Sequence, residues 1–208
     1  MRKFRIRDRL ILNQVIIPIF KGIPLLTSKM YRFKLWLEAM KIWEDLSILK
    51  YERVIRVLAI KEEMSNIPND YKSAAFDNLH SEDVISLKNF YNSNWVAGFV
   101  EGDGSFNIVN KEDNRFVPGF TITQKLDPHI LSHLKSIFHI KAAVRWNKTY
   151  YILDTTSLRS VTNIMKYFRN LLISLKYSEY RIWCRAIHYY KLGHNDKILH
   201  CRNLLKKL

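Results

Sequence analysis

The pattern of apolar and polar positions is clearest in the second half of the chain. Aromatic and β-branched side chains are typical of strands, and the strands they predict are 105–111, 116–125 and 142–154. Helical spacing and small apolar residues predict helices at 95–104, 128–139, 157–169 and 177–191. Asp127 and Pro128 are typical of the cap and the first position of a helix. This pattern predicts an α+β unit with the order α-β-β-α-β-β-α-α.

An internal repeat relates the two halves of the chain. Shifted by 147 positions, the chain matches itself without a gap over nearly forty residues. The matched pairs include Leu25 and Leu172, Lys29 and Lys176, Phe33 and Tyr180, Trp36 and Trp183, and Ala39 and Ala186. Met1 corresponds to Lys148, so the first copy begins just before its last strand, which is expected at Phe4–Arg7. The chain therefore contains one and a half copies of the repeat.

The repeat also predicts how the chain is divided. Residues 1–62 are the carboxyl-terminal half of a first copy, including a helix-rich connector from residue 42. Residues 63–94 are a polar linker, and residues 95–208 are a complete copy. Trp36 and Trp183 have apolar neighbours, so we expect them to pack in the core.

The charge of the chain indicates the kind of partner. The 208 residues contain 34 Lys and Arg against 19 Asp and Glu, a net charge of +15, and 48% of the residues are hydrophobic. Bulk disorder and an acidic scaffold are excluded by these values. Such a charge repels itself, which favours a polyanion as partner, and nucleic acid more than an anionic membrane. The apolar stretches are far shorter than the roughly 20 residues of a membrane span.

Cysteine and histidine do not indicate a metal centre. Cys184 and Cys201 are the two cysteines and lack C-x-x-C spacing, which argues against a disulfide framework or a structural zinc site and fits a reducing compartment. His194, His200 and Cys201 follow Gly193 at irregular spacing. We expect these three residues to lie on the exterior.

The segment Trp95–Phe106 has the composition of a functional helix end. Ala97, Gly98 and Gly102 leave one helix face almost without side chains, which suits the close approach of another backbone. Glu101 and Asp103 lie at the negative end of the helix dipole, where acids are unfavourable unless a cation is present. A divalent metal ion would remove this conflict.

The string Val96–Gly104 resembles the LAGLIDADG motif of homing endonucleases and intron maturases, and the resemblance extends over 95–208. It implies a saddle built from α-β-β-α-β-β-α repeats, with two such helices packed at its centre. Each helix would bring its last acid to a shared site for a divalent metal such as Mg²⁺. The resemblance implies that this acid is Asp103, with Glu101 as a weaker metal ligand in a more structural position.

The same resemblance implies three further catalytic residues. Gln124 matches the polar residue that organises water near the metal. Lys176 matches the active-site lysine, and Lys29 matches its counterpart in the first copy. Carboxylates that hold a hard cation, with lysines nearby, suit hydrolysis of a phosphodiester bond.

The predicted sheet would carry the DNA on its concave face. Alternation along the strands predicts that one set of side chains shares a side of the sheet, and the resemblance implies that this side faces the major groove: Ser105, Asn107, Val109, Lys111, Thr121, Thr123, Arg145 and Asn147. Phosphate contacts are predicted for Arg115, Lys125 and Lys148. A register error of one residue would turn each strand's set to the opposite face.

The chain has one motif and half of an extra copy of the repeat. This arrangement fits neither the family members with two motifs nor those with one. We therefore expect the carboxyl-terminal part of a two-motif protein, which would need a missing amino-terminal half or a second copy of itself. Three functions stay open: a site-specific endonuclease for double-stranded DNA, a maturase that binds its host intron RNA, and an inactive remnant. Frequent Ile, Lys, Asn, Tyr and Phe are consistent with an AT-rich genome, so expression in mitochondria, or alternatively chloroplasts, is expected.

Overall fold

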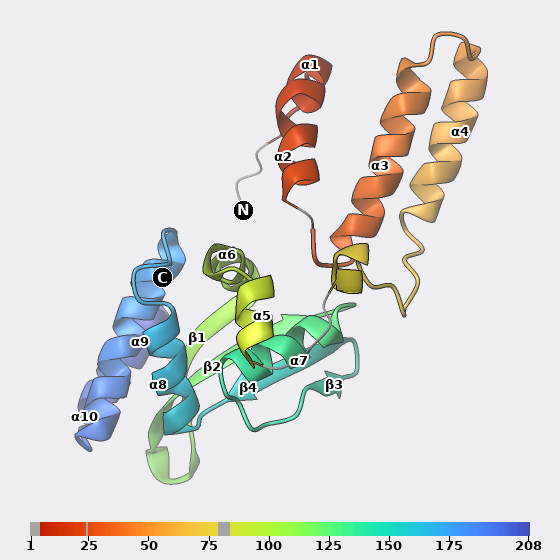
Figure 1. Ribbon diagram of the computed structural model, residues 1–208. Helices are drawn as coiled ribbons and strands as arrows, with labels where there is room; N and C mark the ends of the chain where they lie inside the picture. Colours follow the sequence, from red (N-terminus) through yellow and green to blue (C-terminus); the bar gives the residue numbers. More distant parts are fainter. Residues whose placement is uncertain (1–4, 24, 79–83) are drawn as a thin grey trace. The chain divides into compact units, whose positions relative to one another are not determined.

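The structure is a computed structural model that describes residues 5–23, 25–78 and 84–208 (Figure 1). The chain forms two compact units, one up to residue 80 and one from residue 81 onward. The second unit contains the α+β fold that the sequence predicts, and the described part of the first unit is helical.

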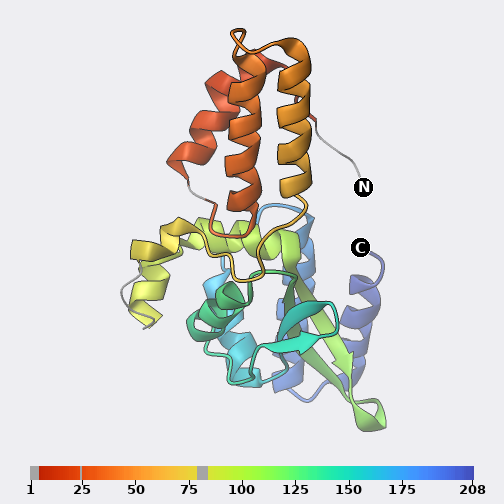
Figure 2. The same cartoon turned by 90° about the vertical axis from the view of Figure 1, so that its right-hand side faces the viewer.

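The second unit is built on a four-stranded antiparallel sheet in the order β1-β2-β4-β3. Its strands are β1 (Gly104–Asn110), β2 (Phe116–Gln124), β3 (Arg145–Asn147) and β4 (Tyr150–Thr155), and the short helix η3 (Glu112–Asn114) joins the first two. The expected strand region 142–154 is therefore two strands joined by a tight turn. The β1–β2 hairpin projects from the unit in Figure 2.

Helices cover one face of this sheet. They are α5 (Val84–Phe90), α6 (Ser93–Asp103), α7 (Pro128–Ile137), α8 (Leu158–Tyr167), α9 (Leu175–Lys191) and α10 (Asn195–Leu205). Helices α6 to α10 all contact the strands. The predicted order of elements is confirmed, and α10 is an additional helix that the sequence pattern did not predict.

Trp183 anchors α9 on the sheet. Its side chain is completely buried, and its indole Nε1 donates a 2.7 Å hydrogen bond to the carbonyl of Gly119 in β2. Its ring lies 5.0 Å from that of Phe106, between centroids. A Cβ at Gly119 would lie against the side-chain oxygen of Asn107, so a larger residue here would require the Asn107 side chain to move. Core packing of Trp183 is thus confirmed, whereas Trp36 is half-buried and stacks on Phe33 in the first unit.

The second unit begins before the motif helix. Helix α5 packs on α7, with Leu87 and Tyr91 completely buried. The Tyr91 hydroxyl lies 2.7 Å from Nδ1 of His133. The segment expected to be a linker, 63–94, therefore includes a helix of the second unit, because its apolar residues complete that unit's core.

The first unit contains helices that continue one another or pack side by side. They are α1 (Arg9–Ile11), the π-helix η1 (Leu12–Ile16), α2 (Ile17–Gly22), α3 (Lys29–Glu44), α4 (Lys50–Glu63) and the 3-10 helix η2 (Ala74–Asn78). Helices α3 and α4 pack together (Figures 1 and 2), and the Tyr31 hydroxyl donates to Glu63 across them at 3.0 Å. Among the described residues, the structure contains no helix long and apolar enough to cross a membrane.

The helices of the first unit follow the repeat. Shifting by 147 residues places η1 and α2 on α8, and α3 on α9. The turns before the paired lysines are also alike: the Lys29 amide donates to Thr27 Oγ1 at 3.3 Å, and the Lys176 amide donates to Ser174 Oγ at 3.2 Å. The expected strand Phe4–Arg7 differs: Phe4 lies outside the described residues, and Arg5–Arg7 are not in a strand. The described part of this unit has no strand with which they could pair.

The same shift relates α4 to α10, although the sequence pattern suggested only a connector there. Three exposed apolar residues of α4 correspond to three that pack inward on α10: Tyr51 to Ile198, Val54 to Cys201, and Leu58 to Leu205. Cys201 is 2% exposed and belongs to a core cluster with Ile108 and Phe116. The expectation that Cys201 lies on the exterior was wrong, because α10 covers the β1 side of the sheet.

Candidate nucleic-acid interface and catalytic centre

Asp103 lies where α6 turns directly into β1. The helix begins at Asn92, whose side chain accepts a 2.8 Å hydrogen bond from the Trp95 amide. It ends at Gly104, where a Cβ would lie 2.7 Å from Val100 Cγ1 and 2.8 Å from the Val100 carbonyl oxygen. The Gly that closes the motif is therefore required by packing, and it places Asp103 at the helix end.

Gln124 holds the Asp103 carboxylate. Its Nε2 donates a 2.5 Å hydrogen bond to Asp103 Oδ2 from the last residue of β2. Asp103 is exposed, so its carboxylate is accessible to a cation or a ligand. The structure brings together two residues that are 21 positions apart and that the sequence analysis assigned to one site.

Glu101 ties the end of α6 to the start of α9. Its Oε1 accepts hydrogen bonds from the Ile173 amide at 2.6 Å and the Ser174 amide at 3.1 Å. Burial alone would raise the pKa of Glu101, but these amide donors and the positive charge of Lys176 hold the pKa below its ordinary value. Its hydrogen bonds fit the structural position that the resemblance implied for Glu101 more than they fit a metal ligand.

Lys176 lies in the first turn of α9, and its ammonium pairs with Glu179 at 2.9 Å. Both side chains are half-buried, with 17% and 23% of their surface exposed. Lys176 and Ser105 line the same cavity, and Ser105 follows Asp103 by two positions. The sequence analysis predicted Lys176 but missed Glu179, since the acid has no counterpart in the repeat: position 32 is Arg.

The side chains near Asp103 could supply only some of the ligands that a divalent cation needs. Within the described ranges, the structure has no group of three or more His, Cys, Asp or Glu side chains able to hold a metal. A carboxylate offers about four lone-pair sites, and the Gln124 bond uses one of them. Asp103 is thus suited to supply one hard oxygen ligand, with water or phosphate oxygens as the others.

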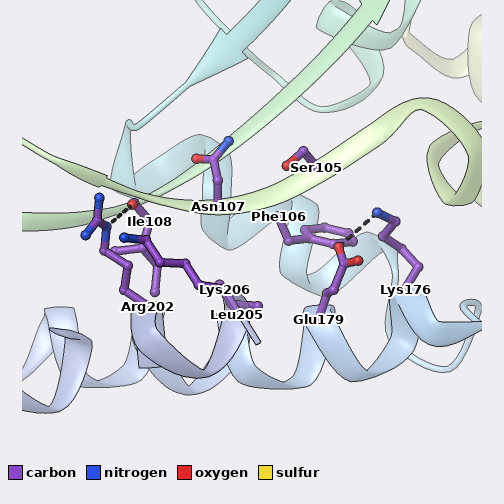
Figure 3. Close-up of a pocket in the computed structure, with 9 residues that line it drawn as sticks. All are labelled: Ser105, Phe106, Asn107, Ile108, Lys176, Glu179, Arg202, Leu205 and Lys206. Carbon is purple, nitrogen blue, oxygen red and sulfur yellow. Dashed lines mark hydrogen bonds and ion pairs between the residues drawn. The ribbon is translucent and has the colours of Figure 1, made fainter. Parts of the chain in front are cut away.

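The predicted polar face of the sheet is present. Burial alternates along β1, so Ser105, Asn107 and Val109 point away from the core. Figure 3 shows Ser105 and Asn107 pointing away from the helices and Phe106 pointing toward them. Register places the remaining predicted strand residues on the same face, because Ser105 pairs with Thr121 and both Thr123 and Arg145 pair with Ile152. Arg145 and Asn147 share one side of β3.

Hydrogen bonds connect the side chains of this open face. Asn107 Nδ2 donates to Thr121 Oγ1 at 2.9 Å, and Arg145 pairs with Asp154 at 2.8 Å. The hydrogen bond and charge of Asp154 raise the pKa of Arg145. Asn147 Nδ2 donates to the Tyr150 hydroxyl at 2.9 Å. Sequence reasoning missed Asp154 and Tyr150. Each lies two positions from Ile152 in β4, and this spacing could have indicated that all three side chains share one face of the sheet.

The predicted phosphate contacts lie at the ends of the strands. Arg115, Lys125 and Lys148 are all exposed and lie in the connections between strands or after β2. Lys111, which was predicted to face the major groove from the end of a strand, is exposed and lies directly after β1. Lys29 begins α3 of the first unit and is exposed. Its catalytic role as the partner of Lys176 stays a prediction.

The small-residue surface of α6 is narrower than predicted. Gly98 and Gly102 are exposed, and a Cβ at either would meet nothing within 4 Å. Ala97 is only 5% exposed and faces the core of its own unit. Ala97 therefore does not share the open face, because neighbouring helix positions point about 100° apart.

Comparison with known proteins agrees with this arrangement. Residues 96–187 match the family described as LAGLIDADG endonuclease. Probable intron-encoded endonuclease Cox1-I1b of Schizosaccharomyces pombe is 28% identical over 99% of this chain and 51% of its own length. Probable intron-encoded endonuclease aI3 of Kluyveromyces lactis is 33% identical over 55% of this chain and 28% of its own length. The chain thus spans about half of the first relative and less of the second.

Solved structures have the same fold. I-SmaMI bound to an uncleaved DNA target in the presence of calcium ions gives a TM-score of 0.78 at 20% identity, covering 96% of this chain and 74% of that one. I-CpaMI, a LAGLIDADG meganuclease bound to uncleaved DNA, gives a TM-score of 0.72 at 17% identity, covering 92% of this chain and 72% of that one. The second unit is an α+β unit with a motif helix that leads into an antiparallel sheet. The segment that matches the LAGLIDADG endonuclease family, residues 96–187, lies within this unit.

Glu101→Gln tests the tie between α6 and α9. Glutamine keeps an acceptor oxygen but loses the charge, so the free energy of unfolding at pH 7 should fall by about 1 kcal/mol. Because the pKa of Glu101 is lowered in the folded chain, its contribution is complete above the ordinary value near 4.3 and is lost as the pH falls below it. Urea unfolding at pH 7 and at about pH 3 measures this difference. Glu112→Gln, an exposed acid in η3, is the control, and equal effects of both substitutions would contradict the tie.

Gly98→Ala and Gly104→Ala test the two surfaces of the motif helix. A methyl group at Gly98 meets nothing, so the better helix propensity of alanine should stabilise the chain by roughly 0.5–1 kcal/mol. At Gly104 the methyl group collides with Val100, which should destabilise it by roughly 1–3 kcal/mol. Thermal and urea unfolding of both variants measures the changes. Destabilisation by Gly98→Ala would show that this face is covered within the chain.

Proposed function

We propose that this chain acts in site-specific cleavage of double-stranded DNA, as an intron-encoded endonuclease that hydrolyses phosphodiester bonds with a divalent metal ion, Mg²⁺. One observation carries the proposal: an exposed carboxylate, Asp103, is held by Gln124 at the point where the motif helix enters a sheet with an open polar face. The relatives named as intron-encoded endonucleases, and the DNA-bound neighbours, support it.

The open face supplies the DNA-binding surface in this proposal. Its strand residues offer hydroxyl, amide and guanidinium groups that can read base edges, among them Ser105, Asn107 and Arg145. Exposed Arg115, Lys125 and Lys148 would contact phosphates. The net charge of +15 supports this partner, because neutralised phosphates release counterions and so favour binding.

The residues at the helix end divide the chemical work. Asp103 would supply a carboxylate ligand to the metal, and Gln124 orients that carboxylate through its hydrogen bond. Lys176 would place a positive charge beside the phosphate, with Lys29 as its counterpart. Glu101 positions Lys176 by fixing the start of α9. When bound, Mg²⁺ polarises a phosphoryl oxygen and lowers the pKa of bound water.

Assembly and location are part of the same proposal. The open Gly98 and Gly102 face of α6 would receive a second motif helix, from another segment or another copy, because bare glycine allows a backbone to approach closely. Expression in the mitochondrion is proposed from the residue usage and from relatives named for introns of cox1.

Binding measurements test the choice of partner. Duplexes selected by the chain from a randomised library, and a structured intron RNA, are titrated with it at 50–300 mM salt. We expect tighter binding to the selected duplex, with log Kd rising steeply with log salt. A slope near zero would overturn the nucleic-acid proposal. Preference for the RNA, without site-specific DNA binding, would support the maturase.

Asp103→Asn tests the catalytic assignment. In the assembly that cuts the selected duplex with Mg²⁺, the amide keeps the shape of the side chain and loses the charge that would hold the metal. Cleavage should therefore fall by at least about 100-fold, while binding in the absence of metal is kept. The control is Asp196→Asn, an exposed acid in the first turn of α10. Cutting that survives in Asp103→Asn would refute the role of Asp103.

A further inference from the structure

A basic cavity lies along the free edge of the sheet. It has a volume of about 360 Å³ and is lined by the first half of β1 together with side chains from α9 and α10 (Figure 3). Strand β1 is an edge strand, since β2 is its sheet neighbour on one side. The sequence analysis assigned no function to α10, yet two of the cationic side chains in this cavity come from this part of the chain: Arg202 lies in α10, and Lys206 follows the helix directly.

Arg202 is fixed in place at two points. Its Nε donates a 3.2 Å hydrogen bond to the carbonyl of Ile108, and its guanidinium carbon lies 5.5 Å from the ring centroid of Phe116. A guanidinium has five N–H donors, and this bond uses one. The group is therefore ordered before any ligand arrives, so less side-chain entropy is lost when an anion binds.

Backbone amides of β1 point to the same edge. In an antiparallel strand the N–H and C=O of one residue point to the same side, and successive residues alternate. The Ile108 carbonyl accepts its hydrogen bond from Arg202 on the side of β1 that faces away from β2. On the side toward β2, Ile108 lies opposite Pro118, which has no N–H to donate. The N–H groups of Ile108 and Phe106 therefore also point to the edge that the cavity borders.

The charges in the cavity favour an anion. Lys176, Arg202 and Lys206 bring three positive charges, and Glu179 brings one negative charge that is paired with Lys176. The cavity keeps an excess of positive charge together with N–H donors. Ser105 and Asn107 lie on its border and also on the open face, so a nucleic-acid strand on that face would pass this edge with its backbone.

We propose that this cavity binds one backbone phosphate of the nucleic acid, with Arg202 of α10 and Lys206, which follows that helix, as its charged contacts. The proposal rests on the nucleic-acid binding proposed above and adds to it a site outside the predicted phosphate contacts. Glu179 limits the affinity by opposing the phosphate charge. Helix α10 thus covers the core with its apolar residues and contacts the backbone with its basic ones.

Two lysines at the end of α10 provide a matched test. Lys206 lines the cavity, Lys207 does not, and both are exposed. On a selected duplex, Lys206→Gln should weaken binding about 3- to 10-fold and lower the salt slope by about one. Lys207→Gln should change the affinity less than 2-fold. Equal effects of the two substitutions would overturn the phosphate site while leaving DNA binding established.

Substitution of the DNA identifies the phosphate. Neutral methylphosphonates are placed one at a time along the selected duplex, and binding of the wild-type chain and Lys206→Gln is compared. We expect one position where the neutral linkage weakens wild-type binding several-fold and has little further effect in Lys206→Gln. If the loss of affinity at every neutral linkage simply added to the loss caused by Lys206→Gln, the proposal would be overturned.

Glu179→Gln should tighten DNA binding about 2- to 5-fold, because it removes the negative charge in the cavity. Weaker binding by this variant would also contradict the proposal. A wild-type chain that binds no DNA would instead refute the proposed function.

Discussion

The arrangement of the end of the sheet where Asp103 lies depends on one carboxylate that accepts hydrogen bonds from two backbone amides. Glu101, near the end of the motif helix, accepts hydrogen bonds from Ile173 and Ser174, which precede α9. This tie fixes the start of α9 beside the start of β1, and thereby brings Lys176 to the end of the sheet where Asp103 lies. Of the two motif acids, Glu101 therefore ties two helices together, whereas the Asp103 carboxylate stays exposed.

The remainder of the second unit makes this end rigid and leaves one face of the sheet open. Trp183 of α9 is bonded to the Gly119 carbonyl, and Phe106 packs on it from β1. Burial of these aromatic rings fixes which side of each strand faces the helices. The opposite side keeps its polar residues in solvent, so the same packing that stabilises the core creates the surface proposed for DNA.

The described part of the first unit repeats helices of the second unit and contains no strand. Thr27 and Ser174 make equivalent turns before the paired lysines, and α4 corresponds to α10. The apolar face that α10 buries against β1 and β2 is, on α4, exposed at Tyr51 and Leu58. Similar local sequence thus gives similar helices in both units, whereas the surroundings decide whether the apolar face is buried.

The sequence by itself determined the order of elements from the motif helix to α9, the repeat, and the face on which Ser105, Asn107 and Thr121 lie. These follow from local periodicity and from residue spacing, which the chain carries without reference to distant contacts. The tertiary structure alone decided that Asp103 meets Gln124, that Lys176 pairs with Glu179, and that Ala97 faces inward. It also placed Cys201 in the core and Arg202 at the strand edge, because such positions depend on how α10 packs against strands nearly a hundred residues earlier.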